Sequence, residues 1–242
     1  MASSEEIRVA APLAGLTSGF IEVRVGDEAS AQSFYVHQDL ICASSEFFER
    51  ALNGDWQEAE DKCVKLPDDE PKVFENYINW LYTGKIPIKC TTIPKGSRMS
   101  REVENEYTAL CELFVFCEKL QDTKGKNAST KALYQGCLEE RTGTLYFPLS
   151  PAINVVYNGT PCTSPLRALL RDGFVNRSAP HWFKDGDDYC KEFLYDVVVG
   201  MATDRAKPSI GLNLEGLSKY LEDESEKKED TATGATGKGG GA

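Results

Sequence analysis

One stretch near the N-terminus decides the fold: Phe34-Tyr35-Val36-His37-Gln38-Asp39-Leu40-Ile41-Cys42, followed at once by Ser44-Ser45-Glu46-Phe47-Phe48. Phe34 and Val36 point to the same side of an extended chain, which predicts a half-buried strand over residues 33–37. From Gln38 onward the pattern changes to two short helices, over residues 38–44 and 45–53. A strand that passes directly into a pair of short helices is therefore the first unit of the predicted fold.

Two further strands are predicted on either side of this stretch. Residues 20–25 alternate between apolar and charged side chains, and Gly26-Asp27-Glu28 then breaks the pattern as a hairpin loop would. Residues 63–66 give a third short strand, with Val64 and Leu66 on one side. The N-terminal region is thus expected to contain a small sheet beside its helices.

The next helix has clear start and stop patterns. Asp68-Asp69-Glu70-Pro71 places acidic residues and a first-turn proline where a helix tolerates them best. Gly84 stands where a left-handed helix cap needs a residue without Cβ. The chain between them carries an apolar stripe at helical spacing: Phe74, Tyr77, Ile78 and Leu81. Residues 85–88 are then expected to form a short edge strand, since Pro87 cannot donate a backbone hydrogen bond to a neighbour.

Helices dominate the rest of the chain. Residues 102–120 are apolar nearly all round, which is typical of a buried helix, and residues 126–140 predict another. Weaker helical patterns cover four later segments: 151–157, a helix that starts at Ser164-Pro165 and is stopped by Gly173, 187–203, and a short piece around 214–221.

Composition separates these segments into regions and restricts the function. We expect a flexible N-terminus (1–18), an α+β domain (19–140), a C-terminal helical region (141–221) and a disordered acidic and Gly-rich tail (222–242). The formal net charge of −11 over 242 residues disfavours non-specific binding to nucleic acid or to an anionic membrane. No apolar run approaches the roughly 20 residues that span a bilayer. Acidic Glu5 and Glu6 do not suit a secretory signal, so we expect an intracellular location, nucleus or cytoplasm.

The order of elements and the quoted motifs resemble the BTB (POZ) domain, over about the first 140 residues. Two more matching stretches complete the resemblance: Val64-Lys65-Leu66-Pro67-Asp68-Asp69 and Phe74-Glu75-Asn76-Tyr77-Ile78-Asn79-Trp80-Leu81-Tyr82-Thr83-Gly84. In detail the chain is most similar to short fungal BTB proteins without companion domains. The resemblance implies a small sheet covered by a cluster of helices. It also implies a set of structural signature residues: His37, Asp39, Trp80, Tyr82 and Gly84.

The residues themselves indicate no catalytic, cofactor or metal site. None of the eight cysteines forms a Cys-x-x-Cys pair, and the only histidines are His37 and His181. His37 lies at a strand–helix junction, where we expect it to hydrogen-bond within the fold, because a general base needs a nucleophile and an orienting partner. We expect His181 to pack with Trp182 and Phe183 beneath a loop.

Three function classes therefore compete. The resemblance implies a non-enzymatic protein-interaction scaffold that self-associates and recruits partners. We expect the homodimer to be weak, because the net charge of −11 makes two copies repel each other. The second class is a substrate adaptor for a cullin-type ubiquitin ligase, although the loop Thr83-Gly84-Lys85 lacks the acidic residue that such adaptors often carry. An enzyme of unknown type ranks last. The candidate interaction surface is the set of apolar residues on the first two helices: Leu40, Ile41, Phe47 and Phe48.

Overall fold

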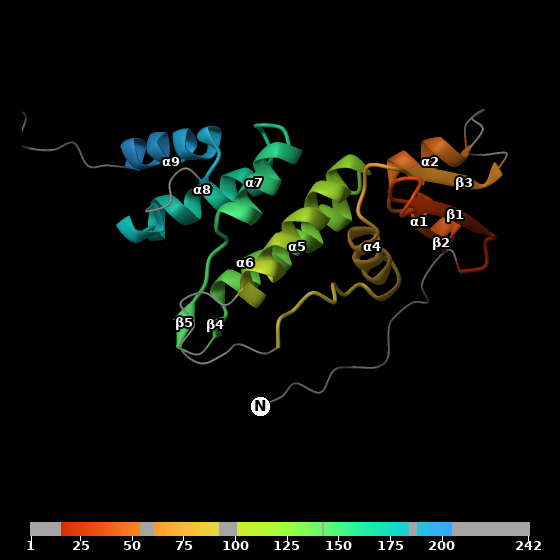
Figure 1. The fold of residues 1–242 in the computed structure, drawn as a ribbon, viewed down its shortest axis with the longest axis horizontal. Helices are drawn as coiled ribbons and strands as arrows, with labels where there is room; N and C mark the ends of the chain where they lie inside the picture. Colours follow the sequence, from red (N-terminus) through yellow and green to blue (C-terminus); the bar gives the residue numbers. More distant parts are fainter. Residues whose placement is uncertain (1–15, 54–60, 92–100, 142, 184–187, 205–242) are drawn as a thin grey trace, which may run out of the picture. The chain divides into compact units, whose positions relative to one another are not determined.

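The computed structural model describes residues 16–53, 61–91, 101–141, 143–183 and 188–204 (Figure 1). The chain divides into two compact units, Met1–Thr203 and Asp204–Ala242, and all the described strands and nearly all the described helical residues belong to the first. The predicted helix over 214–221, the tail 222–242 and most of the predicted flexible N-terminus lie outside the described residues.

The first half of the unit is an α+β arrangement, as predicted. Its elements are β1 (Phe20–Val25), β2 (Gln32–His37), α1 (Gln38–Cys42), α2 (Glu46–Asn53), β3 (Cys63–Leu66), α4 (Pro71–Thr83), α5 (Arg101–Lys119) and α6 (Thr123–Leu138). The sheet order is β2-β1-β3. β1 pairs antiparallel with β2 and parallel with β3, so that Val23 stands opposite Phe34 on one side and Val64 on the other.

The hairpin between β1 and β2 is closed by the residues that the sequence indicated. Gly26 adopts φ +103°, a left-handed conformation that favours glycine. Asp27 Oδ1 then accepts hydrogen bonds from the backbone N–H groups of Ala29 (3.1 Å) and Ser30 (2.8 Å). This turn fixes the register that sends the apolar side chains of both strands to one face.

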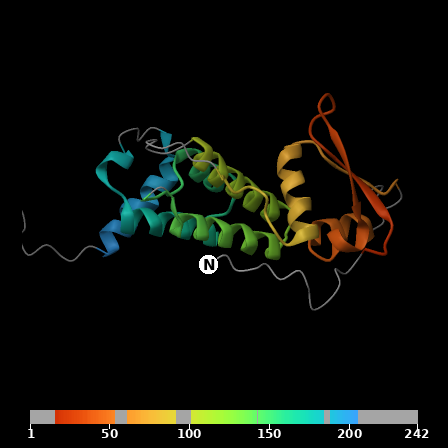
Figure 2. The same ribbon diagram turned by 90° about the horizontal axis from the view of Figure 1, so that it is seen from below.

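Helix α4 lies between the sheet and α5 (Figure 2). Phe74 carries this contact, because its ring meets Phe34 of β2 at 5.0 Å and Phe116 of α5 at 5.9 Å between centroids. The helix ends as predicted at Gly84, which has φ 69° and donates its backbone N–H to the Trp80 carbonyl oxygen at 2.7 Å.

The edge strand predicted over residues 85–88 is wrong. This segment pairs with no described strand, and Ile86 and Ile88 instead pack partly buried against both apolar cores of the unit. Pro87 explains the outcome physically, since a segment without that N–H gains less from strand pairing than from burying its two isoleucines.

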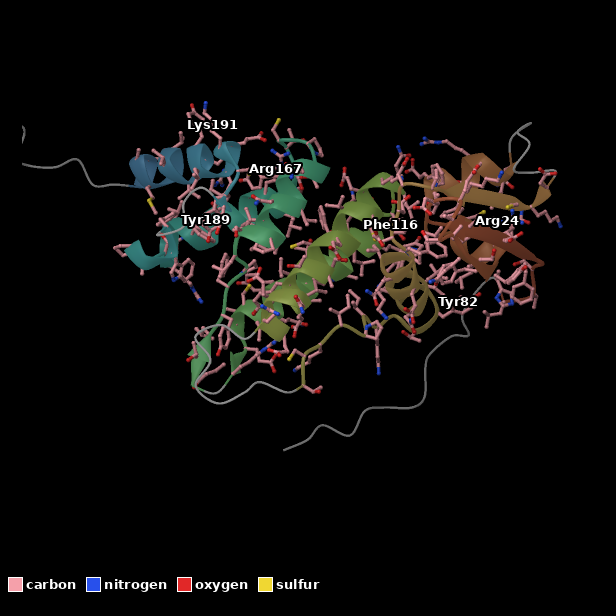
Figure 3. All side chains as sticks on the ribbon, viewed as in Figure 1. Arg24, Tyr82, Phe116, Arg167, Tyr189 and Lys191 are labelled. Atoms are coloured by element: carbon pink, nitrogen blue, oxygen red, sulfur yellow. The ribbon has the colours of Figure 1, made fainter. Side chains whose placement is uncertain are left out.

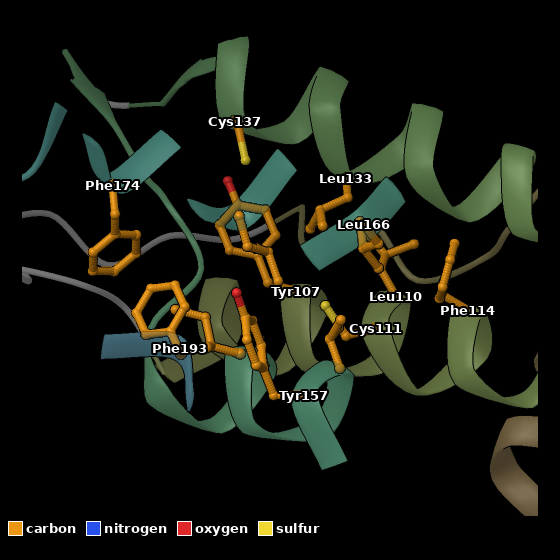
Figure 4. Close-up of a cluster of buried hydrophobic side chains, with 14 of the residues drawn as sticks. Tyr107, Leu110, Cys111, Phe114, Leu133, Cys137, Tyr157, Leu166, Phe174 and Phe193 are labelled. Carbon is orange, nitrogen blue, oxygen red and sulfur yellow. The ribbon is translucent and has the colours of Figure 1, made fainter. Parts of the chain in front are cut away.

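Helix α5 belongs to two apolar cores at once. Near its C-terminal end, Leu113, Phe116 and Cys117 join the sheet core formed with α1, α2 and α4. Along the rest of the helix, other side chains join a helical core that Figure 4 shows. The α5 members of this helical core are Val103, Tyr107, Leu110, Cys111 and Phe114. One helix therefore holds both halves of the unit together.

The helical core is completed by the elements after α6. They are the short strands β4 (Glu140–Arg141) and β5 (Thr144–Leu145), α7 (Ser150–Gly159), α8 (Pro165–Arg177), the 3-10 helix η1 (Pro180–Phe183) and α9 (Lys191–Asp204). The β4–β5 hairpin was not predicted. Phe174 of α8 and Phe193 of α9 are fully buried in this core, with ring centroids 4.9 Å apart (Figure 4).

Gly173 does not stop α8, contrary to prediction, and the helix continues to Arg177. A Cβ added at Gly173 would meet the Phe147 ring at 1.8 Å, far inside van der Waals contact. The glycine is therefore needed for the close approach of an aromatic ring to the helix, not for a helix end. A glycine inside a helix costs only about 1 kcal/mol, which this packing can offset.

Two buried arginines connect elements that are distant in the sequence. Arg141 of β4 forms a two-pronged ion pair with Glu106 of α5, at 2.8 and 2.7 Å, and both side chains are buried. Arg167 of α8 donates to the Tyr157 carbonyl oxygen at 2.6 Å and pairs with Glu192 of α9 at 2.7 Å (Figure 3). Through these hydrogen bonds and ion pairs, the two arginines link separate elements of the helical core.

Candidate functional site

Two of the predicted signature residues, His37 and Tyr82, meet where α4 packs against the end of β2. Tyr82 Oη lies 2.8 Å from His37 Nδ1 and accepts the backbone N–H of His37 at 3.1 Å. The tyrosine hydroxyl thus ties the end of α4 to the start of α1. His37 hydrogen-bonds within the fold, as the sequence predicted.

The other signature residues have different roles. Gly84 caps α4, and Asp39 is exposed and donates its backbone N–H to Ser18 Oγ at 3.1 Å. Trp80 is only half-buried, contrary to the burial that the family resemblance implied, and it packs at the edge of the sheet core with its ring 5.8 Å from that of Tyr77. Its outer side stays open to solvent, because the following segment covers it only in part.

The candidate interaction surface on the first two helices is largely internal. Leu40, Ile41 and Phe48 are buried in the sheet core, with exposed fractions of 6%, 0% and 0%. Phe47 is half-buried and lines a hollow of about 340 Å³ with Ala51 and Val64. The predicted four-residue patch is therefore corrected to Phe47 alone, because the small sheet needs the other three side chains as its cover.

An exposed aromatic strip lies instead on the outer face of the sheet. Phe20 is 57% exposed and Tyr35 is 67% exposed. Phe20 is paired across the strands with His37, and their ring centroids lie 4.3 Å apart. We call Phe20, Tyr35 and the half-buried His37 beside them the aromatic strip. Alternation along β1 and β2 could have revealed it, because the residues opposite to the buried valines must face outward.

Charged groups beside the aromatic strip pair with each other. Arg24 Nε donates to Glu22 Oε1 at 2.8 Å, and Ser33 Oγ donates to the same oxygen at 2.7 Å. These hydrogen bonds lower the pKa of Glu22, so the carboxylate stays ionised at neutral pH. The outer face of the sheet therefore combines two exposed aromatic rings with a neutralised ion pair.

Two of the cysteines are held as thiols by burial. Burial raises the pKa of Cys42 to about 11 and that of Cys137 to about 12, which keeps both thiols protonated at neutral pH. Within the described ranges, no three His, Cys, Asp or Glu side chains gather as metal ligands would. Trp182 and Phe183 pack half-buried against the helical core, and the side chain of His181 lies outside the described residues.

Glu104 of α5 is a carboxyl group whose protonation changes near neutral pH. Its two oxygens are buried near the first backbone N–H groups of α7 without a hydrogen bond of normal geometry. Burial raises the pKa of Glu104 to about 7, and the N–H groups of Leu149 and Ala152 lower it only in part. The folded state therefore prefers the protonated form of this group.

This raised pKa predicts a loss of stability with rising pH. The stability that protonated Glu104 contributes is fully present below pH 4.5, the pKa of this group in the unfolded chain. It is lost as pH rises through about 7, its pKa in the folded protein. Solvent screens part of the cost, so we expect Glu104→Gln to stabilise the protein by about 1–2 kcal/mol at alkaline pH and to have little effect in acid. Chemical denaturation across this pH range measures the difference. The exposed neighbour Glu102, changed to Gln, should not alter the pH dependence.

Comparison with known proteins identifies one domain within the chain. Residues 21–103 match the family model of the BTB/POZ domain. A stretch of 95 residues is 25% identical to TD and POZ domain-containing protein 4 of Mus musculus, covering 37% of this chain and 23% of that protein. The match thus spans less than a quarter of the mouse protein. Both findings confirm the BTB/POZ domain predicted from the motifs.

One further observation concerns membranes. None of the helices in the described part of the chain is both long enough and apolar enough to cross a bilayer.

Proposed function

We propose that this chain, whose residues 21–103 form a BTB/POZ domain, is a non-enzymatic scaffold that associates weakly with a second copy and recruits protein partners. The BTB/POZ domain is a protein-interaction module. The observation that supports self-association is the aromatic strip, because large apolar side chains exposed next to each other favour a protein partner.

The strip also suits a symmetric contact. Two copies that meet face to face would stack Phe20 and Tyr35 of each copy, with Glu22 and Arg24 already neutralised between them. A stable interface buries about 1,600 Å² in total, which is more than one small strip supplies. The net charge of −11 adds repulsion between copies. We therefore expect a dissociation constant in the micromolar range, about −8 kcal/mol, and tighter association at higher salt.

Sedimentation equilibrium from micromolar to tens of micromolar protein tests this proposal. The wild-type chain should shift from monomer to dimer with concentration. A Phe20→Thr, Tyr35→Thr double variant should weaken the dimer at least tenfold, because it removes the rings and keeps a residue that suits a strand. Tyr195→Thr is the control, since Tyr195 is 68% exposed on α9, away from the sheet. A wild-type monomer at every concentration would exclude self-association.

The second candidate is a substrate adaptor for a cullin-type ubiquitin ligase. The BTB/POZ match supports it as a class, while Thr83-Gly84-Lys85 supplies no carboxylate in the loop after α4. Gel filtration with a purified cullin N-terminal region separates the two candidates. Co-elution with the wild-type chain would favour the adaptor, and separate peaks together with a concentration-dependent dimer would favour the scaffold.

A further inference from the structure

A groove of about 730 Å³ lies between helix α6 and the segment that leaves α4. Figure 1 shows that segment running beside α5 and α6. The groove has an apolar floor, formed by Trp80, Ile86, Ile88, Leu110, Ala128 and Ala132. All of these except Leu110 are only half-buried, so solvent still reaches them. We call this feature the lysine groove, after the charges around it.

Cationic side chains surround the floor. They are Lys85, Lys89, Lys124, Lys131 and Arg141, and they come from the post-α4 segment, from α6 and from β4. The same groove contains two anionic groups, Glu106 and Glu139. The groove thus carries a surplus of three positive charges in a chain whose formal net charge is −11.

The two carboxylates in the groove are already neutralised by protein groups. Glu106 is held by Arg141, and its Oε2 also accepts the backbone N–H of Cys90 at 2.7 Å. Glu139 accepts Lys89 Nζ at 2.7 Å and Arg141 at 3.1 Å. Neither Lys124 nor Lys131, in contrast, has a carboxylate within ion-pair distance among the described residues, although the Asp122 carboxylate at the start of α6 attracts Lys124. Two of the three surplus charges, those of Lys124 and Lys131, therefore lie on the α6 side of the groove.

Helix geometry sets the spacing of that charge. Lys124 and Lys131 are two turns apart on one face of α6, about 10 Å along the helix axis at ~1.5 Å per residue. Asn127 and Gln135 are exposed on the same face and line the groove. An extended peptide advances roughly 3.1 Å per residue, so acidic residues three positions apart would match this spacing.

We propose that the lysine groove binds an acidic segment of a partner protein, with carboxylates on Lys124 and Lys131 and an apolar side chain on the floor around Ile86 and Ile88. The inference rests on the recruiting role proposed above and names the chemistry of one partner. The apolar floor favours a peptide over a nucleic acid, because a phosphate backbone needs cations but no apolar surface. The negative charge of the whole chain would also repel a long polyanion.

Fluorescence anisotropy on the full chain tests the proposal. The probe is a fluorescein-labelled peptide of three Glu-Leu-Glu repeats, and its charge-reversed counterpart, three Lys-Leu-Lys repeats, is the peptide control. We expect saturable binding of the acidic probe that weakens with salt, and no binding of the basic one. An unlabelled nonaglutamate should compete less well than the unlabelled form of the acidic probe, because it lacks the apolar side chain.

Charge reversal on the protein locates the site. Lys131→Glu should weaken binding about threefold, and the Lys124→Glu, Lys131→Glu double variant about tenfold or more. Both lysines are exposed on α6, so the substitutions should leave the fold intact, which circular dichroism checks. Lys191→Glu is the matched control, because Lys191 is exposed in the first turn of α9 and lines no part of the groove.

Four results would overturn the proposal: no saturable binding of the acidic probe, equal binding of both peptides, binding unchanged in the double variant, or stronger binding of a single-stranded oligonucleotide than of the acidic probe. Sedimentation equilibrium on the same samples keeps the two proposals apart. If the chain dimerises but does not bind the acidic probe, the scaffold function is supported and the acidic-peptide site is refuted.

Discussion

Replacing Glu106 with alanine should lower the free energy of unfolding by about 3–5 kcal/mol, because it leaves the buried Arg141 guanidinium without its main counter-ion. Both side chains are nearly inaccessible, at 5% and 7% exposed, so water from the groove and Glu139 compensate only in part for the lost partner. The same change removes the acceptor for the backbone N–H of Cys90. Thermal unfolding followed by circular dichroism should show a decrease in Tm of roughly 10 °C.

Two further variants test the cause of this loss. The exposed pair Arg50–Glu46 on α2, also 2.7 Å long, is the matched control, and Glu46→Ala should cost no more than about 0.5 kcal/mol. A double variant with Met at both Glu106 and Arg141 should recover much of the stability, because it removes the uncompensated charge as well. A double variant as unstable as Glu106→Ala would show that packing, not charge, explains the loss.

Phe174→Ala should be as damaging, with a cost of about 3–5 kcal/mol from lost burial and from the cavity it leaves. Phe174 is fully buried, and its ring meets those of Phe147, Trp182 and Phe193 at 4.9–5.7 Å. Because α5 joins both cores, we expect the weakened protein still to unfold in one transition, monitored by near- and far-ultraviolet circular dichroism.

The control for this variant is Tyr195→Ala on α9, whose ring is 68% exposed and should contribute well under 1 kcal/mol. Two separate transitions in Phe174→Ala would contradict the expected coupling and would show that the helices after Ser150 unfold independently of the sheet.

Local patterns explain which parts of the fold the sequence predicted. The alternation in β1 and the cap at Gly84 each depend on only a few neighbouring residues, so the sequence alone predicts them. The β4–β5 hairpin could not be found in this way, because strands of two residues are too short to show a period. Gly173 was misread because its reason is a ring 26 positions earlier in the sequence, Phe147.

Surface features were harder to predict from the sequence than helices and strands. The apolar character of Leu40 and Ile41 is evident in the sequence, but whether the sheet covers them depends on packing. The lysine groove gathers cations from segments up to 56 positions apart, from Lys85 to Arg141, so no basic run marks it in the chain. Charge clusters of this kind become visible only when the topology brings their segments together.

The double role of α5 also determines where the protein can be cut. A recombinant fragment ending near Glu140 would contain the whole BTB/POZ match but would lose α7, α8 and α9. It would then uncover the side of α5 that packs against α7, where Val115 lies against Gly159, and the helical core would lose buried Ile153 and Val156. Such a bare apolar surface promotes aggregation. Fragments for partner screening should therefore extend at least to the end of α9, so that non-specific association is not mistaken for specific binding of a partner.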